Sequence, residues 1–283
     1  MLRLFSAPAD EVPPVCLWGK HGIGKTALIN DLAADKGWPL VTISPAQFEE
    51  MGDLLGLPYL DNGAEEGHPR SRFAPPEWVP QSEGPGILLI DDFNRADDRI
   101  LRGLMALWQE RRLSSWALPQ HWFIVLTANP EGEFYSVTPV DEASLTRMLH
   151  LQLHFDVHSW AVWAHREALP AEAIDFVLQH PEVIDGQRTT ARTLTFFFRL
   201  WQQYDMPSAD DSHLRLLLQS SVQDHAAQQF LAFLQDQQFE LPDAPTLLRQ
   251  PLGQSQALFE TLLASTPPRQ DLLSLLMSRL LVY

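Results

Sequence analysis

Eight residues near the start of the chain constrain its fold more than any other segment. Residues 19–26 read Gly-Lys-His-Gly-Ile-Gly-Lys-Thr and fit the pattern G-x-x-x-x-G-K-[ST] in full. Glycines in such a loop let backbone N–H groups converge on phosphate oxygens, at the positive end of the helix that follows. The pattern predicts a bound nucleoside triphosphate, with Lys25 reaching its β- and γ-phosphates and the Thr26 hydroxyl binding Mg²⁺.

The first half of the chain alternates short apolar runs with segments of helical spacing, which is typical of a parallel sheet with crossover helices. A strand is predicted at residues 15–18, directly before the loop, and a helix at 26–34, with an inward stripe of Ala27, Leu28, Leu32 and Ala33. This context favours a phosphate loop over a glycine turn with a solvated lysine. Further elements are predicted as strands at 39–43, 86–90, 122–126 and 149–155, and as a helix at 100–110.

From about residue 157 the strand-like runs end and helical spacing takes over. Helices are predicted at residues 159–168, 171–179, 191–203, 211–235, 254–263 and 271–282. The chain is therefore expected to contain an α/β domain over residues 1–156, followed by an all-helical region.

Two acids follow the third predicted strand. Asp91 and Asp92 come directly after the apolar run 86–90. The carboxyl end of a parallel strand is where ligands bind in open α/β sheets. We therefore expect Asp91 to hold the Mg²⁺ shell and Asp92 to polarise the attacking water, whereas the alternative is an acidic loop after a buried strand.

These motifs together resemble an AAA+ ATPase, most closely its MoxR-like branch, which is grouped with dynein-related domains. The resemblance covers residues from about 13 to 200 and is carried by the phosphate loop and by the segments 89–96, 124–130, 145–148 and 189–192. It implies an α/β P-loop NTPase core with a five-stranded parallel sheet in the order 5-1-4-3-2, strands being numbered along the chain. It also implies a helical lid at 157–205 and a C-terminal helical extension at 206–283.

The resemblance also implies roles for single residues. Asn129 would orient water against the γ-phosphate. Arg147 would complete the site of a neighbouring subunit, and the alternative for this residue is a surface ion pair. Arg192 would report the nucleotide state from the lid, a role for which Arg188 competes. ATP and Mg²⁺ are the implied cofactors, and the implied nucleotide-binding residues are Gly19, Lys20, His21, Gly22, Ile23, Gly24, Lys25, Thr26 and Ala27. ATP in preference to GTP follows from the resemblance alone.

The sequence departs from the family pattern at the catalytic acid. The family usually has glutamate there, and Asp92 is one methylene shorter, which makes slow turnover conceivable. The stretch 52–84, rich in Gly, Pro and acid, is predicted as a long loop. Its Phe73 and Trp78 would either grip a polypeptide in the channel of a ring or belong to a rigid segment packed on its own domain.

The net charge of the chain disfavours nucleic acids and anionic membranes as partners. With 20 basic and 36 acidic residues, the net charge is 20 − 36 = −16, which repels phosphate backbones and anionic lipid over most of the surface. His150, His154, His158 and His165 lack accompanying cysteines or ordered carboxylates, so they are interpreted as solvated or packed rather than as metal ligands. A single cysteine and the absence of a signal-peptide pattern at the start of the sequence lead us to expect a soluble cytoplasmic protein.

Three functions fit these features. The leading hypothesis is a ring-forming, hexameric Mg²⁺-dependent ATPase of MoxR type that remodels a protein partner in a chaperone-like way. The resemblance implies that the partner is often a protein with a von Willebrand factor A domain. The alternatives are an AAA+ motor in nucleic-acid processing, which the net charge disfavours, and a nucleotide-gated scaffold with weak hydrolysis, which the shorter Asp92 supports.

Overall fold

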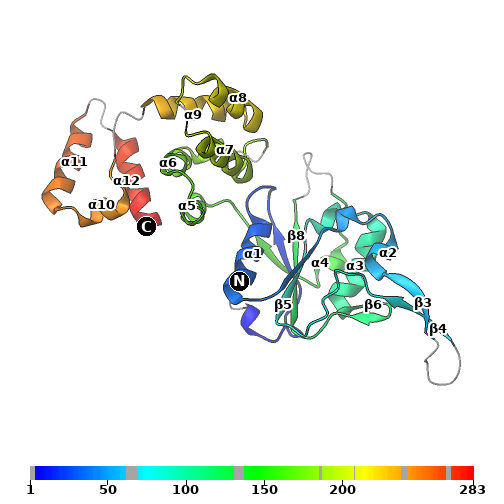
Figure 1. Ribbon diagram of the computed structural model, residues 1–283. Coiled ribbons are helices and arrows are strands. Elements are labelled where there is room, and N and C mark those ends of the chain that lie inside the picture. Colours follow the sequence, from blue (N-terminus) through cyan, green and yellow to red (C-terminus); the bar gives the residue numbers. More distant parts are fainter. Residues whose placement is uncertain are drawn as a thin grey trace. The chain divides into compact units, whose positions relative to one another are not determined.

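The chain consists of two compact units, residues Met1–His154 and Phe155–Tyr283. The computed structural model describes residues 4–61, 69–130, 137–184, 187–206, 208–236, 241–265 and 269–283 (Figure 1). No helix within these ranges has the length and apolar character that crossing a lipid bilayer requires.

The first unit is built on a parallel sheet. Its strands are β1 (Val15–Trp18), β2 (Leu40–Ile43), β5 (Gly86–Ile90), β8 (Trp122–Ala128) and β9 (Leu149–Gln152). They lie in the order β2-β5-β8-β1-β9, and every neighbouring pair is parallel. Numbered along the chain, this is the predicted order 5-1-4-3-2. Every residue of β5 and β8 is buried, as continuous apolar runs in a two-sided sheet require.

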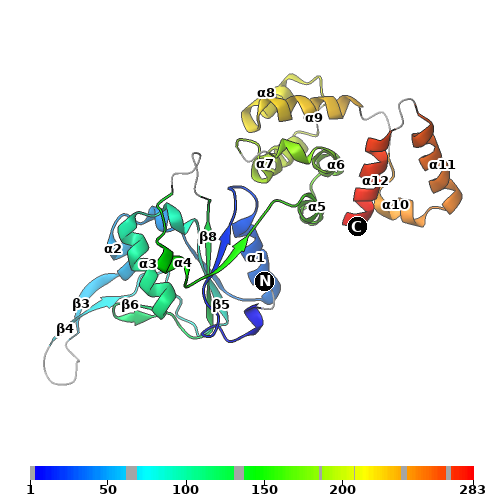
Figure 2. The ribbon, with the colours of Figure 1, turned by 180° about the vertical axis from the view of Figure 1, so that it is seen from behind.

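Helices cover both faces of this sheet. Alternate residues of each strand point to opposite faces, so Ile87 and Leu89 pack with α1 (Lys25–Lys36), whereas Leu88 and Ile90 pack with α3 (Asp98–Glu110). Figures 1 and 2 show α1 on one side of the sheet and α3 on the other. The shorter elements of the unit are η1 (Leu4–Ser6), η2 (Pro45–Gln47), α2 (Met51–Leu55), η3 (Phe93–Arg95), β6 (Arg112–Leu113), β7 (Trp116–Ala117) and α4 (Glu142–Leu145).

The predicted inward stripe of α1 is confirmed at Leu32 and Ala33 and is wrong at Ala27 and Leu28. Leu28 is 38% exposed and Ala27 is also exposed, whereas Ile29 is fully buried. The stripe that faces the sheet consists of Lys25, Ile29, Leu32 and Ala33. Lys25, the first residue of the helix, points inward because its ammonium binds the carbonyl oxygens of the phosphate loop. This contact fixes which side of α1 faces the sheet.

The stretch 52–84 is not one long loop, contrary to the prediction. It contains the end of α2 and an antiparallel hairpin of β3 (Leu57–Asp61) and β4 (Arg70–Ala74), which projects away from the sheet (Figure 1). Its residues 62–68 lie outside the described residues. The hairpin escaped prediction because its residues are largely exposed on both faces, so no alternation of apolar and polar residues marks it.

The second unit is helical, with most of its helices at the predicted positions. They are α5 (Val157–Arg166), α6 (Ala171–Gln179), η4 (Pro181–Val183), α7 (Ala191–Gln203), α8 (Ser212–Ser221), α9 (Asp224–Asp236), α10 (Ala244–Arg249), α11 (Leu252–Ala264) and α12 (Gln270–Val282). One core joins α5 to α9 around buried aromatic residues such as Phe176 and Phe230. Helices α7 and α8, on either side of the expected 205/206 boundary, share this core.

The single helix predicted at 211–235 is wrong, because the chain breaks into α8 and α9. Val222 is extended at this break and is buried in the core. The N–H of Gln223 donates to Thr189 Oγ1 at 3.0 Å. Apolar spacing continues across the break, so the tertiary contacts, rather than the pattern, end the helix there. The short α10 was not predicted.

Candidate functional site

Glycines shape the loop between β1 and α1. Gly22 and Gly24 have φ of 71° and 99°, a left-handed conformation that side chains with a Cβ atom disfavour. At Gly19 a Cβ atom would lie 2.5 Å from Ile23 Cδ1 and 2.8 Å from the Leu153 carbonyl oxygen. The loop is therefore closely fitted to the strand ends around it, and the remaining predicted nucleotide-binding residues Lys20, His21 and Ala27 lie on it or directly after it.

Lys25 is buried at the start of α1, with 6% of its surface exposed. Its Nζ donates to the carbonyl oxygens of Gly19 and Lys20 at 2.8 and 3.1 Å, and to Asn129 Oδ1 at 3.0 Å. The ammonium is thus held among oxygen acceptors inside the loop, as a buried charge requires. The sequence motif placed Lys25 here, but its link to Asn129 comes from the sheet order, which puts β8 beside β1.

The Thr26 hydroxyl and the Asp91 carboxylate meet, although 65 residues separate them in the chain. Thr26 Oγ1 donates to Asp91 Oδ1 at 2.9 Å. Thr127 Oγ1, fully buried in β8, donates to the same oxygen at 2.6 Å and accepts from the Asp92 N–H at 2.8 Å. One hydroxyl therefore fixes both acids of the pair.

Asp92 is held in a left-handed backbone conformation with φ 49°. Its Oδ1 accepts from Asn129 Nδ2 at 2.9 Å, and its Oδ2 lies 3.6 Å from Arg95 Nε. Asn129 is fully buried and thus bridges the ammonium of Lys25 to the carboxylate of Asp92. The predicted water-activating acid and water-orienting amide are adjacent, at the carboxyl edge of the sheet.

Two further residues complete this network and were not singled out from the sequence. Thr127 links the two acids, and Asn94 fixes the backbone of Asn129. Asn94 Nδ2 donates to the Asn129 carbonyl oxygen at 2.8 Å, and Asn94 Oδ1 accepts from the Asn129 N–H at 3.2 Å. The available signal was a polar residue near the carboxyl end of a buried strand, since Thr127 lies in the last two residues of β8 and Asn94 lies in η3, shortly after β5.

Arg147 lies in the turn after α4 and is exposed. Its Nη1 donates to the Ala143 carbonyl oxygen at 2.8 Å, and it forms no ion pair with any described residue. A surface ion pair, the alternative interpretation of this arginine, is therefore absent from the described part of the chain. The guanidinium lies at the surface of the first unit rather than in the network around Lys25.

The two candidate arginines of the second unit differ in their environment. Arg188 Nη2 donates to the carbonyl oxygens of Gln219 and Ser220 at 2.8 and 2.7 Å, so its side chain caps the end of α8. Arg192 is exposed in the first turn of α7, and within the described ranges it has no hydrogen-bond or ion-pair partner. Arg188 therefore has a structural task, whereas Arg192 can contact a ligand.

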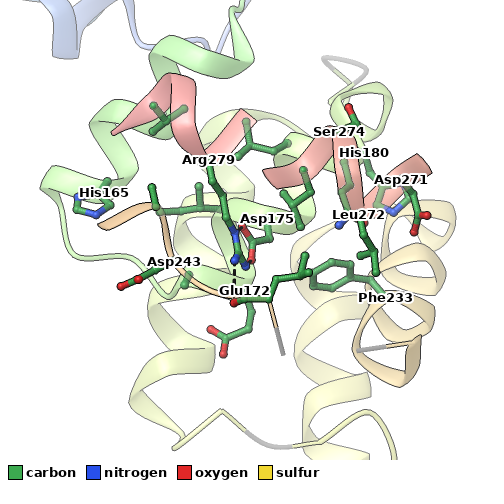
Figure 3. A pocket seen from close by; sticks show the side chains of 18 of the residues that line it. His165, Glu172, Asp175, His180, Phe233, Asp243, Asp271, Leu272, Ser274 and Arg279 are labelled. Carbon is green, nitrogen blue, oxygen red and sulfur yellow. Dashed lines mark hydrogen bonds and ion pairs between the residues drawn. The ribbon is translucent and has the colours of Figure 1, made fainter. Parts of the chain in front are cut away.

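The second unit also contains a cavity of about 1280 Å³, lined by residues of α5, α6, α9, α10 and α12. Figure 3 shows Asp175 and Arg279 facing each other in its wall. Arg279 Nε donates to Asp175 Oδ1 at 2.9 Å, and its Nη1 donates to the carbonyl oxygens of Leu241 and Pro242 at 3.0 and 2.9 Å. Burial raises the pKa of Asp175, although Arg279 opposes this shift. The pair ties α6 to α12 and to the chain before α10.

A family match covers most of the first unit. Residues 14–148 match the AAA domain (dynein-related subfamily). A relative, midasin from Giardia intestinalis, is 26% identical over 175 residues, which are 58% of this chain and 4% of midasin. The chain thus spans only a small fraction of that relative.

Solved structures also resemble the chain at low sequence identity. NtrX from Brucella abortus, in complex with ADP, is 14% identical with a TM-score of 0.44, over 92% of this chain and 58% of NtrX. A RuvB mutant from Thermotoga maritima is 17% identical with a TM-score of 0.42, over 95% of this chain and 80% of RuvB. The family match runs from the residue before β1 to the turn that contains Arg147. Residues 14–148 therefore match an AAA+ ATPase domain of the dynein-related subfamily.

Proposed function

We propose that the protein is a Mg²⁺-dependent ATPase of MoxR type that assembles into a ring and remodels a protein partner. The observation that carries the proposal is the convergence of Lys25, Thr26, Asp91, Asp92 and Asn129 in one hydrogen-bonded network. Phosphoryl transfer needs cations and a positioned water more than covalent chemistry, and these side chains supply both needs.

The donor set suits Mg²⁺. This ion takes oxygen ligands and is commonly held by one or two carboxylates together with substrate phosphates. Thr26 Oγ1 and Asp91 Oδ1, 2.9 Å apart, offer a hydroxyl and a carboxylate of this kind. No group of three or more His, Cys, Asp or Glu residues forms a metal site within the described ranges, so the protein supplies few ligands and the phosphates would supply others. When bound, Mg²⁺ would neutralise phosphate charge.

The remaining site residues act on the water and the γ-phosphate. Asp92 accepts a proton from the attacking water, and Asn129 holds that water in line. Arg192 contacts the γ-phosphate from the lid. Two observations support this role: its guanidinium has no hydrogen-bond or ion-pair partner among the described residues, whereas that of Arg188 is bonded to the end of α8. Arg147 enters the site of the adjacent subunit, a role supported by its exposure at the edge of the unit.

Assembly and partner are proposed from the resemblance. An arginine supplied by a neighbour requires an oligomer, and we propose a hexameric ring that acts on a protein partner, such as one with a von Willebrand factor A domain. The resemblance to MoxR-type proteins supports this. The acidic net charge of −16 weighs against a nucleic-acid substrate.

One observation favours a second function, a nucleotide-gated scaffold with slow hydrolysis. The shorter acid Asp92 is tied on one oxygen by Asn129 and faces Arg95 on the other. Both contacts hold the carboxylate in place and compete with water for its oxygens. A scaffold of this kind would bind ATP tightly and change shape without frequent turnover.

A titration with ATP and with GTP, followed by turnover at several protein concentrations, tests these functions. We expect binding and hydrolysis of ATP, abolished in Lys25→Ala and Asp91→Asn, with turnover per chain rising with protein concentration. Tight binding with turnover insensitive to Asp92→Asn would establish the scaffold instead. Absence of nucleotide binding by the folded protein would refute both.

A further inference from the structure

A histidine in β9 connects two segments of the first unit. His150 Nδ1 accepts a hydrogen bond from Trp18 Nε1 at 2.8 Å, and His150 Nε2 lies 2.7 Å from the Leu145 carbonyl oxygen. An indole N–H only donates and a carbonyl oxygen only accepts, so both bonds together require a neutral ring with its hydrogen on Nε2. The ring therefore acts as a spacer of fixed length between Trp18 and Leu145.

The sheet places this spacer. β1 and β9 are parallel neighbours, and Cys16 pairs with His150 in their register. Side chains two residues apart on a strand share a face, so Trp18 and His150 lie on the same face of the sheet. Their rings are 6.0 Å apart between centroids.

At one end the spacer contacts the nucleotide loop. Trp18 directly precedes Gly19, whose carbonyl oxygen accepts from Lys25 Nζ at 2.8 Å. The Trp18 indole also packs edge-to-face against Phe93, the residue after Asp92, with ring centroids 6.4 Å apart. A displacement of the loop or of the acid pair is therefore transmitted to the Trp18 side chain by direct packing.

At the other end the spacer contacts the turn that presents Arg147. The Leu145 carbonyl oxygen accepts from the Met148 N–H at 3.2 Å, which closes a turn with Arg147 inside it. The same oxygen takes the bond from His150. Met148 is buried and anchors the turn, whereas Arg147 is exposed. The position of this turn thus depends on a bond that originates beside the nucleotide loop.

We propose that Trp18 and His150 are positioning residues that couple the nucleotide site of one subunit to the Arg147 that the same subunit offers to its neighbour. The proposal rests on the proposed function, in which Arg147 acts in the adjacent site. A catalytic arginine contributes about 10³–10⁵-fold to the rate, and a misplacement of about 1 Å can cost about 100-fold. Loss of the spacer therefore lowers turnover without removing any group from the nucleotide site.

Three variants isolate the spacer. Trp18→Phe keeps an aromatic ring but removes the N–H donor, and His150→Leu removes both polar contacts from an exposed position. We expect each to keep its ATP affinity within about twofold and to lose about 10–100-fold in turnover. His150→Gln can accept and donate as the imidazole does, and should recover most of the rate. His154→Leu, an exposed histidine with no side-chain hydrogen bond to another described residue, serves as the matched control.

Mixing subunits then separates positioning from a general structural defect. Lys25→Ala chains lack a working site but retain Arg147 and the spacer, so they can serve a neighbour. Mixed with His150→Leu or Trp18→Phe chains, whose own sites are intact, they should give a turnover well above the sum of the two chains measured alone. Thermal unfolding of each variant without nucleotide shows which chains are folded.

The control mixture is Arg147→Ala with Lys25→Ala. If this control is rescued and the spacer mixtures are not, the positioning role is overturned while the neighbour-supplied arginine stands. If the control mixture gives no activity, Arg147 does not act in the adjacent subunit, and the proposed coupling is refuted together with that role. Full turnover of Trp18→Phe and His150→Leu alone would also overturn the coupling, whatever the mixtures give.

Discussion

Thr127 offers the sharpest test of the hydrogen-bonded network. Its hydroxyl is the one group that contacts both acids, donating to Asp91 Oδ1 at 2.6 Å and accepting from the Asp92 N–H at 2.8 Å. Thr127→Val replaces this hydroxyl with a methyl group of similar size in a strand where every residue is buried. The change therefore removes two hydrogen bonds without opening a cavity.

The loss of stability in Thr127→Val can be estimated from the donor that is left without an acceptor. An unsatisfied buried donor costs about 1–3 kcal/mol, and the Asp92 N–H loses its acceptor here. Because both carboxylates are partly exposed and can gain water, we expect the lower half of this range, about 1–2 kcal/mol. For a unit of this size, that loss lowers the unfolding midpoint by about 2–8 °C.

Calorimetric or circular-dichroism melting without nucleotide measures this loss, and ATP titration measures its effect on the site. Since Asp91 loses one of its two hydroxyl donors, we expect weaker Mg²⁺-dependent ATP binding in Thr127→Val. Thr127→Ser keeps the hydroxyl and deletes only a methyl group, so it should retain the affinity of the parent. Unchanged melting and unchanged affinity in Thr127→Val would refute the assignment of Thr127 as the link between the acids.

Three further outcomes are expected. Arg95→Ala should raise turnover, because it releases one oxygen of Asp92. The increase should be at most about fivefold, since a partly exposed ion pair contributes at most about 1 kcal/mol. Unchanged or lower turnover would count against a restraining role of Arg95. Hydrogen bonds from the hydroxyl and the backbone N–H of Ser159 lower the pKa of Asp156, which caps α5. Asp156 therefore stabilises the fold above the ordinary aspartate pKa of 3.8, and this contribution is lost as the pH falls through the lower pKa of the folded state. In denaturant titrations at a series of pH values, Asp156→Asn should make the free energy of unfolding fall less steeply at acid pH. Arg279→Met leaves the carboxylate of Asp175 buried without its partner and should destabilise the second unit by about 3–5 kcal/mol, whereas the double variant with Asp175→Leu should recover most of that loss in the same titrations.

The sequence alone determined the core architecture of the first unit. The phosphate-loop motif fixes a strand, a loop and a helix together, because only that order aims backbone N–H groups at one point. The apolar runs 86–90 and 122–126 predicted strands, and the structure places them as the interior strands β5 and β8, in which every residue is buried. These features are local, so they could be predicted from spacing and residue type.

Tertiary structure decided which distant residues meet and which segments stop. Thr127 and Asn94 became parts of the site because the parallel strands β5 and β8 end side by side, a pairing that no local pattern records. The break between α8 and α9 follows from the contact of Gln223 with Thr189 and not from any interruption of apolar spacing. Most elements of the chain are therefore encoded locally. The hydrogen-bond network and the break between α8 and α9 depend instead on long-range contacts, which only the folded sheet and bundle establish.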